Sequence, residues 1–258
     1  MQVLLAKTWM PDINPSGFLI SEKLDGVRSI WNGKHLLSRE GNRFHAPDWF
    51  TAQLPNVMLD GELWLGRDML QETVSIVTTE RMDKGWNRIT YMLFDVPDIR
   101  APFEQRLEIL RKVAGHIKIC HVLDQIKCTS REHMDQALKV VKSMNGEGLM
   151  LRKPGSFYEH KRSSTLYKVK TWIDAEAVVI DHTPGKGKYV GMMGNLVCRL
   201  PSGVQFEIGT GFDDDDRTNP PPVGSTVMFK YNRMTQATNG KKPKPYIPVF
   251  RGPRPKGI

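Results

Sequence analysis

The stretch SEKLDGVRSIW brings a lysine, an aspartate and an arginine close together, at Lys23, Asp25 and Arg28. A lysine amine attacks only when it is neutral, and desolvation or neighbouring cations must lower its usual pKa of about 10.4. Lys168 and Lys170 lie two apart in the expected strand LYKVK, so they face one side together and can supply such a positive field. The alternative is an ordinary cluster of surface ion pairs. The pattern KxDGxR is therefore evidence for a nucleophilic lysine only if further motifs of a catalytic site accompany it.

Five such motifs follow in the chain. They are SREGNRF (38–44), LDGEL (59–63), YMLFDV (91–96), EGLMLR (147–152) and LYKVK (166–170). Together with EKLDGVR they resemble, in order and approximate spacing, the motifs of the covalent nucleotidyltransferases, a superfamily of DNA ligases, RNA ligases and mRNA capping enzymes. Within it the chain looks most like the minimal bacterial ATP-dependent DNA ligases called type E. Their C-terminal half resembles the stretches DAEAVVIDHTPGKGKYVGMMGNL and NPPPVGSTVMFKY.

The resemblance implies a three-step reaction. Lys23 would attack the α-phosphate of ATP, release pyrophosphate and become lysyl-AMP; AMP would pass to the 5′-phosphate of a nicked duplex; the 3′-hydroxyl would then attack and expel AMP. A phosphoryl centre crowded with negative oxygens needs cations around it. The implied partners are therefore ATP, Mg²⁺ (for which Mn²⁺ could substitute) and nicked double-stranded DNA, bound by a monomer.

The resemblance also implies roles for single residues. Glu62 would bind the ribose, Phe94 would stack on the adenine, and Glu147 would hold the metal ion. Each has an ordinary alternative, because Phe94 could be a core residue and the two glutamates could be surface acids. The implied nucleotide-binding set is Lys23, Arg28, Glu62, Phe94, Lys168 and Lys170, and Arg39 would contact the 5′-phosphate of the nick. Asp25 and Asp60 are expected to have structural roles.

Basic residues near the C-terminus suggest contacts with DNA. Lys186 and Lys188 lie in the glycine-rich stretch PGKGKYVGMMGN, which could grip a phosphate backbone or form a basic hairpin turn without a partner. Arg251 and Arg254 match only loosely the C-terminal arginine motif with which many ligases orient pyrophosphate, so their role is open. The net charge of +9, with 37 Lys and Arg against 28 Asp and Glu, favours a polyanionic partner or simply maintains solubility.

Two regions must position these residues. The first mixes expected strands (57–65, 89–96, 148–153) with expected helices (101–115, 134–148). After Asp174 the helical periodicity ends, and short strands are expected at 176–182, 194–200, 203–210 and 225–232, with a solvated loop at the acidic run 213–216. The fold class expected is an α+β nucleotidyltransferase (adenylation) domain, residues 1–173, followed by a small all-β OB-fold domain, residues 174–258.

Other bulk properties exclude several classes of protein. No apolar run approaches the roughly 18 residues of a membrane span, so no membrane association is expected. Cys120, Cys128 and Cys198 lack the spacing of a zinc site or a disulfide framework. No secretory leader is visible, which indicates the cytoplasm, or the periplasm if a leader has been removed.

Three other functions fit parts of the pattern. A capping enzyme would use the same lysine chemistry, but SREGN and EGLMLR look like ligase motifs. An RNA ligase is disfavoured by the OB-fold expected directly after YKVK. A non-catalytic nucleic-acid-binding protein is disfavoured because every candidate catalytic position has the expected residue type.

Overall fold

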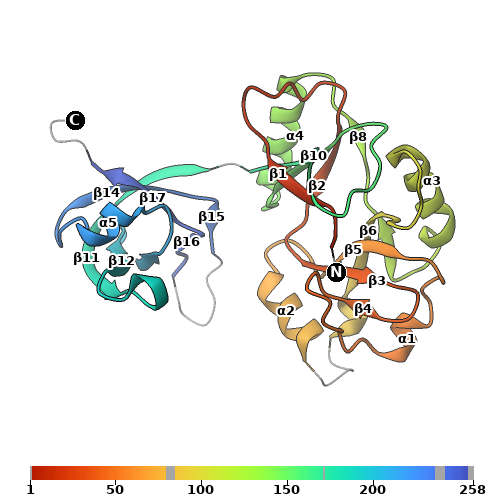
Figure 1. Ribbon diagram of the computed structural model, residues 1–258, viewed down its shortest axis with the longest axis horizontal. Coiled ribbons are helices and arrows are strands. Elements are labelled where there is room, and N and C mark those ends of the chain that lie inside the picture. Colours follow the sequence, from red (N-terminus) through yellow and green to blue (C-terminus); the bar gives the residue numbers. More distant parts are fainter. Residues whose placement is uncertain (1, 80–84, 171, 236–241, 255–258) are drawn as a thin grey trace. The chain divides into compact units, whose positions relative to one another are not determined.

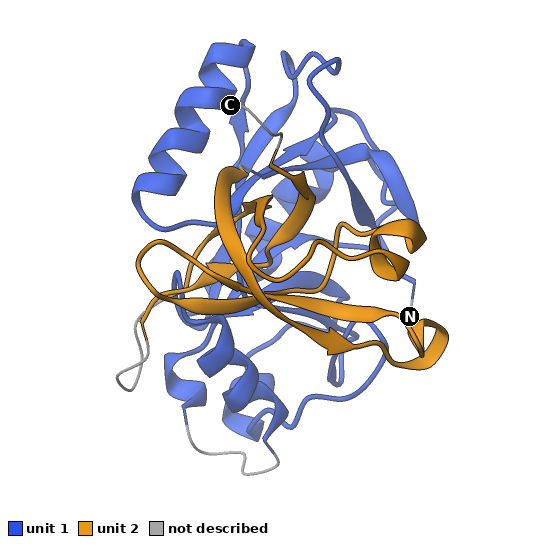
Figure 2. Ribbon diagram, turned by 90° about the vertical axis from the view of Figure 1, so that its left-hand side faces the viewer, with its two compact units in different colours: residues 1–170 blue, residues 171–258 orange. Residues whose placement is uncertain are grey.

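The computed structural model describes residues 2–79, 85–170, 172–235 and 242–254. Contacts within the chain divide it into two compact units, Met1–Lys170 and Thr171–Ile258 (Figures 1 and 2). The limits expected from the sequence, 1–173 and 174–258, stay a prediction about the domains. Among the described residues, no helix is both long enough and apolar enough to cross a membrane.

Unit 1 contains two five-stranded sheets, which we call sheet A and sheet B. Sheet A has the order β1-β10-β9-β2-β8, and sheet B has the order β4-β3-β5-β6-β7. The strands of sheet A are β1 (Leu5–Thr8), β2 (Leu19–Lys23), β8 (Ile126–Lys127), β9 (Gly148–Arg152) and β10 (Arg162–Val169). Those of sheet B are β3 (Val27–Trp31), β4 (Leu36–Leu37), β5 (Leu59–Trp64), β6 (Thr90–Asp95) and β7 (Cys120–Val122).

The register of sheet A determines which side chains share a face. Lys23 pairs with Gly148 and Ser21 pairs with Met150, while Met150 also pairs with Lys168 on the other neighbouring strand. Side chains two apart on a strand point to the same face, and paired residues of neighbouring strands do so too. Lys23, Ser21, Met150 and Lys168 therefore lie on one face of the sheet.

The opposite face of sheet A packs against helix α4 (Arg131–Ser143), which lies beside it in Figure 1. Ile20 and Leu151 from the sheet and Leu138 from the helix belong to this core. The helix expected at 134–148 is confirmed, but it begins earlier, because the Ser130 side chain caps it by accepting a hydrogen bond from the backbone N–H of His133 (3.2 Å).

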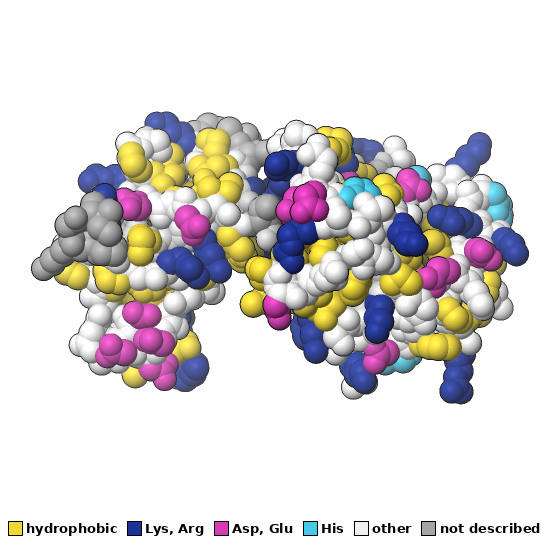
Figure 3. All heavy atoms as spheres, turned by 90° about the horizontal axis from the view of Figure 1, so that it is seen from above, with side chains coloured by type: hydrophobic (Ala, Val, Ile, Leu, Met, Phe, Trp, Pro, Cys, Tyr) yellow, Lys and Arg dark blue, Asp and Glu magenta, His cyan; other side chains and the backbone are white. Residues whose placement is uncertain are grey.

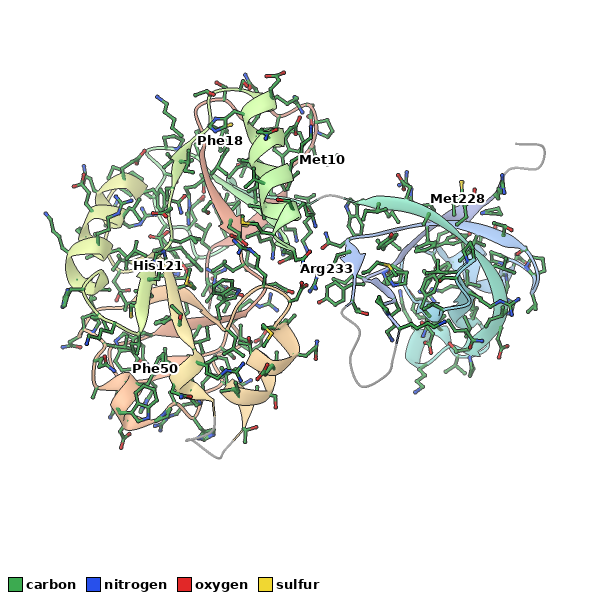
Figure 4. The ribbon with its side chains drawn as sticks, turned by 180° about the vertical axis from the view of Figure 1, so that it is seen from behind. Met10, Phe18, Phe50, His121, Met228 and Arg233 are labelled. Carbon is green, nitrogen blue, oxygen red and sulfur yellow. The ribbon has the colours of Figure 1, made fainter. Side chains whose placement is uncertain are left out.

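Three helices pack against sheet B: α1 (Asp48–Thr51), α2 (Leu70–Thr78) and α3 (Phe103–Ala114). Phe50 of α1, labelled in Figure 4, is fully buried there. Its ring centroid lies 4.9 Å from that of Trp86 in an edge-to-face contact. The helix expected at 101–115 is confirmed as α3, whereas α2 was not predicted. A 3₁₀ turn, η1 (Trp86–Arg88), precedes β6.

Unit 2 is a small β-barrel with its own apolar core. Its sheet has the order β13-β12-β11-β14-β17, and a bridge between Thr210 and Val249 joins the two edges. This is the partly open five-stranded arrangement of an OB-fold. The strands are β11 (Ile173–Pro184), β12 (Met193–Arg199), β13 (Gln205–Ile208), β14 (Thr226–Tyr231) and β17 (Val249–Pro253), with a hairpin of β15 (Arg233–Met234) and β16 (Pro245–Tyr246) and a 3₁₀ turn η2 (Gly187–Tyr189).

The prediction of a solvated loop at the acidic run 213–216 was wrong. Residues Asp214–Thr218 form helix α5, and the side chains of Asp213 and Asp216 close a capping box with each other's backbone N–H groups. Carboxylates in a first helical turn are favoured because they accept from unpaired N–H groups at the positive end of the helix. A run of aspartates was interpreted as a solvated loop when it is a helix start.

Gly148 should be needed for the pairing of β9 with β10. A Cβ atom added there would lie 2.2 Å from the carbonyl oxygen of Val169, and a backbone atom cannot rotate away. We expect Gly148→Ala to lower the free energy of unfolding, measured by urea denaturation, by about 3 kcal/mol. Gly155→Ala is the control, because its Cβ would meet nothing and only its positive φ of 68° opposes the change, by about 1 kcal/mol. Equal losses in the two variants would contradict the assignment.

Candidate active site

A cavity of about 290 Å³ opens between the inner faces of sheets A and B. Strands of both sheets contribute to its walls, so it lies entirely within unit 1. Residues from all six sequence motifs meet in it. Its walls include six residues that the sequence analysis assigned to nucleotide or phosphate contacts: Lys23, Arg28, Arg39, Glu62, Phe94 and Lys168.

A buried carboxylate is shared between two lysines at one end of the cavity. Glu147, which immediately precedes β9, is only 6% exposed and forms an ion pair with Lys23 through Oε2. Its Oε1 lies 2.5 Å from Nζ of Lys170, which follows the last residue of β10. Burial alone would raise the pKa of Glu147, but the charges of Lys23 and Lys170 outweigh it and hold this pKa below its usual value.

A third lysine lies on the same wall, but Glu147 is not its ion-pair partner. Lys168 faces the cavity two residues before Lys170. Burial lowers its pKa, and the positive charges of Lys170 and Lys23 lower it further. Lys23 and Lys168 line the cavity, and Lys170 adds positive charge beside them, so this cationic wall attracts an anion such as a phosphate.

Arg28 is held in the opposite wall by a closed set of hydrogen bonds. Its Nε and Nη2 donate to the two carboxylate oxygens of Asp60 at 3.0 and 2.6 Å, and its Nη1 donates to the backbone oxygen of Leu4 at 2.7 Å. Tyr158 donates to the same carboxylate at 2.6 Å and accepts from the backbone N–H of Leu4 at 3.2 Å. Asp60 is fully buried, so it has the structural role expected from the sequence.

Glu62 and Phe94 lie beside Arg28. Glu62 pairs in register with Arg28 across strands β3 and β5, and the Arg28 guanidinium lies 5.4 Å from the centre of the Phe94 ring. Burial raises the pKa of Glu62 to about 7, although the charges of Lys23 and Arg28 oppose the rise. The cavity thus combines a half-buried aromatic ring, a carboxyl group whose pKa lies near neutral pH and several cations, and this combination suits a nucleotide better than an apolar ligand.

The donor set fits a magnesium ion that arrives with phosphates. Within the described part of the chain, no three His, Cys, Asp or Glu side chains lie close enough to hold a metal ion among themselves. Mg²⁺ is usually bound through one or two carboxylates together with substrate phosphates and water. Glu147 supplies one such carboxylate, and its two lysine partners would accompany the phosphates.

The remaining sequence candidates lie outside this cluster. Arg39 lines the cavity but is 58% exposed and pairs with its neighbour Glu40 (2.9 Å). Lys186 and Lys188 belong to unit 2, where Nζ of Lys188 lies 4.6 Å from the centre of the Tyr189 ring. Arg251 lies on β17 of the same unit, and Arg254, which directly follows that strand, forms an ion pair with Glu176 at 3.2 Å. Figure 3 shows Lys and Arg side chains over both units on the face in view.

Sequence reasoning missed several residues of the cavity. Ser21 and Met150 could have been found by counting in steps of two from Lys23 and along β9, as the pleat of a strand requires. Arg152 lies in a quoted motif but received no role, and Gln125 carries no local signal. Contacts between residues far apart in the chain bring Gln125 to the cavity, and they bring Tyr158 to the carboxylate of Asp60 behind Arg28.

Comparison with known proteins assigns both units to the same kind of enzyme. A family model described as an ATP dependent DNA ligase domain matches residues 5–170, and one described as a DNA ligase OB-like domain matches residues 184–252. The DNA ligase of Haemophilus influenzae is 39% identical over 233 residues, which cover 88% of this chain and 84% of that protein. The expected order of an adenylation domain and an OB-fold is therefore confirmed.

Solved structures agree with this assignment. A Lig E DNA ligase, described as binding DNA with a minimal scaffold, superposes with a TM-score of 0.91 at 40% identity over 98% of this chain and 99% of that one. The Chlorella virus DNA ligase-adenylate gives a TM-score of 0.59 at 29% identity, covering 100% and 99%. These matches favour a DNA ligase over a capping enzyme, an RNA ligase or a non-catalytic binding protein. The chain belongs to the ATP-dependent DNA ligases, enzymes that form phosphodiester bonds, and it resembles the minimal Lig E members along nearly its whole length.

Proposed function

We propose that this ligase seals nicks between a 5′-phosphate and a 3′-hydroxyl in duplex DNA, with Lys23 as the residue that carries AMP. The observation that supports this most directly is the position of the Lys23 amine. It lies in a cavity of the ligase domain beside two further lysines, and the same cavity contains Glu62, Phe94 and Arg28. A nucleophile, a cationic wall and nucleoside contacts are therefore present together.

In the first step the Lys23 nitrogen forms a bond to the α-phosphorus of ATP, and the bond to pyrophosphate breaks. Lys23 is paired with Glu147, so before it attacks it must leave this partner and release its ammonium proton to water. Lys170 can remain as the counterion of Glu147 when Lys23 leaves. Lys168 and Lys170 would then face the phosphate oxygens and stabilise their charge.

The roles of the other residues follow from their positions. Phe94 would stack on the base, and an ionised Glu62 would accept hydrogen bonds from the ribose hydroxyls. Glu147 would hold Mg²⁺, which when bound would neutralise negative charge on the phosphates. Arg28 is held rigidly by Asp60, so it can contact the nucleotide without losing much conformational freedom.

The later steps use the same cavity with DNA bound. AMP passes from the Lys23 nitrogen to the 5′-phosphate of the nick, which frees the amine, and the 3′-hydroxyl then attacks that phosphate and releases AMP. Arg39, exposed at the cavity, would contact the 5′-phosphate. Lys186 and Lys188 of the OB-fold would bind the DNA backbone. We also propose that one protomer acts alone, which light scattering should show as a one-to-one complex with nicked DNA.

Lys23→Ala should abolish the covalent step. Incubation of the native enzyme with ATP and Mg²⁺ should add the mass of one AMP in an intact-mass spectrum, and Lys23→Ala should show none, because no other amine replaces the nucleophile. Lys153→Ala is the control, since Lys153 is exposed just beyond β9. A mutant that still forms the adduct would remove Lys23 from the mechanism. Native enzyme already carrying AMP must first be discharged with pyrophosphate.

Glu62 should make nucleotide binding depend on pH. Because its pKa is raised to about 7, the carboxylate is protonated below that pH and loses its role as a hydrogen-bond acceptor. The affinity for α,β-methylene-ATP, which cannot transfer AMP, should fall by up to about tenfold per pH unit below about pH 7. Titration calorimetry would measure this. Glu62→Gln should bind more weakly and retain only the slope of the ligand's own phosphates; an unchanged slope would exclude Glu62 as the titrating group.

The sealing reaction should depend strongly on salt, because cationic side chains that bind DNA release counterions. We expect the rate at subsaturating nicked DNA to fall at least about tenfold between about 50 and about 200 mM salt. Replacing Lys186 and Lys188 by Gln together should lower the logarithmic slope by about two. Replacing Lys112 and Lys139, exposed on α3 and α4, removes the same charge and should leave the slope unchanged. A flat profile for the native enzyme would argue against this mode of binding.

A further inference from the structure

Two buried polar atoms in the wall of the cavity have no hydrogen-bond partner among the residues that the structure describes. They are the side-chain oxygen Oε1 of Gln125 and the guanidinium nitrogen Nη1 of Arg152. A buried polar group without a partner is unfavourable and is rare in native proteins. We infer that Gln125 and Arg152 read the edge of the adenine base, with Gln125 accepting a hydrogen bond from the 6-amino group and Arg152 donating to a ring nitrogen.

The position of Gln125 follows from the pairing of β8 with β2. Gln125 immediately precedes β8, whose Ile126 pairs with Ile20 in an antiparallel register. One residue further along each strand, Gln125 lies across from Ser21, on the face that carries Lys23. Its amide therefore belongs to the inner face of sheet A.

Arg152 lies on the same face but further from Lys23. It pairs with Leu19, four residues before Lys23 along β2, and a strand rises about 3.3 Å per residue, so the two rows are about 13 Å apart. This is on the order of the length of a nucleoside monophosphate. With the α-phosphate held at Lys23, the far edge of the base would point towards Gln125 and Arg152.

Arg152 cannot turn its free nitrogen elsewhere. It is only 5% exposed, its Nη2 lies 3.1 Å from Oδ2 of Asp95, and its guanidinium lies 4.6 Å from the centre of the Phe103 ring. Asp95 is also bound by Arg106 through Nε at 2.7 Å and Nη2 at 3.1 Å. Two buried arginines therefore share one carboxylate, and Arg152, whose Nη1 is buried without a partner, is one of the residues that line the cavity.

The two free groups complement adenine. Adenine carries an exocyclic amine, which donates, next to ring nitrogens, which accept. A site that makes a hydrogen bond to a substrate amine rejects an analogue that lacks it, because the acceptor is then buried without a partner. The inference rests on the proposed function, since it requires that the cavity binds ATP, and it adds the groups that select the base.

The test compares ATP with purine riboside 5′-triphosphate, which has hydrogen in place of the 6-amino group. The native full-length chain should form its AMP adduct about ten- to a hundredfold faster than the corresponding purine adduct, measured as single-turnover rates by intact mass. In Gln125→Leu the ATP rate should fall to that of the analogue, while the analogue rate stays unchanged. A purely structural role would slow both reactions equally. Gln136→Leu, at an exposed position of α4, should retain the native ratio.

Two further comparisons test Gln125 and Arg152 separately. Gln125→Glu retains an acceptor oxygen and should retain a preference for ATP. Among 1-deaza-, 3-deaza- and 7-deaza-ATP, at least one should react more slowly than ATP, which would identify the ring nitrogen that Arg152 contacts; equal rates for all three would overturn that part. Equal rates for ATP and the purine analogue in the native chain would overturn the role of Gln125. Failure of the native chain to form any adduct would instead overturn the proposed function.

Discussion

The shared carboxylate of Glu147 is the interaction on which the rest of the site depends. It lies almost completely buried between Lys23 and Lys170, and without it the neighbouring ammonium groups of Lys23, Lys168 and Lys170 would repel one another with no opposite charge between them. A buried charge is tolerated only where partners of opposite sign surround it. With two partners, Glu147 can release one without being left unpaired. The same arrangement therefore stabilises the fold in the absence of nucleotide and lets the nucleophile leave its partner.

The register of the strands in sheet A places both lysines next to Glu147. Gly148 and Lys23 are paired residues, and Lys170 extends the neighbouring strand on the other side, so one row across three strands brings both lysines to Glu147. The next row contributes Ser21, Met150 and Lys168. Residues that line the cavity therefore recur in steps of two along the strands of this face, and cationic side chains extend from Lys23 through Lys168 to Arg152.

Sequence alone predicted the parts of this design that are local. The strand that contains Lys168 and leads to Lys170, the helix α3 and the motifs around Lys23 and Glu62 are all encoded within a few neighbouring residues. Helix α2 was missed because it is stabilised by tertiary contacts, which leave no clear local pattern in the sequence. The start of α5 was missed because its capping box consists of aspartates, which are also common in loops. Gln125 and Tyr158 were missed because only long-range contacts bring Gln125 to the cavity and Tyr158 to Asp60. Sequence motifs therefore identify the reacting groups better than they identify the surrounding residues that orient those groups.

The strand pairing of unit 1 also has a consequence for protein synthesis. Strand β1, near the beginning of the chain, lies parallel to β10, which ends at Val169, and Leu4 beside it completes the hydrogen bonds around Arg28. A ribosome makes the N-terminal segment first and must deliver more than one hundred and sixty residues before its partner strand exists. Such distant pairing is slow to form and leaves an unpaired strand exposed in the meantime. The nucleotide site can therefore close only late in translation, and a nascent chain halted within this unit would expose the edge of β1 to chaperones or to other chains.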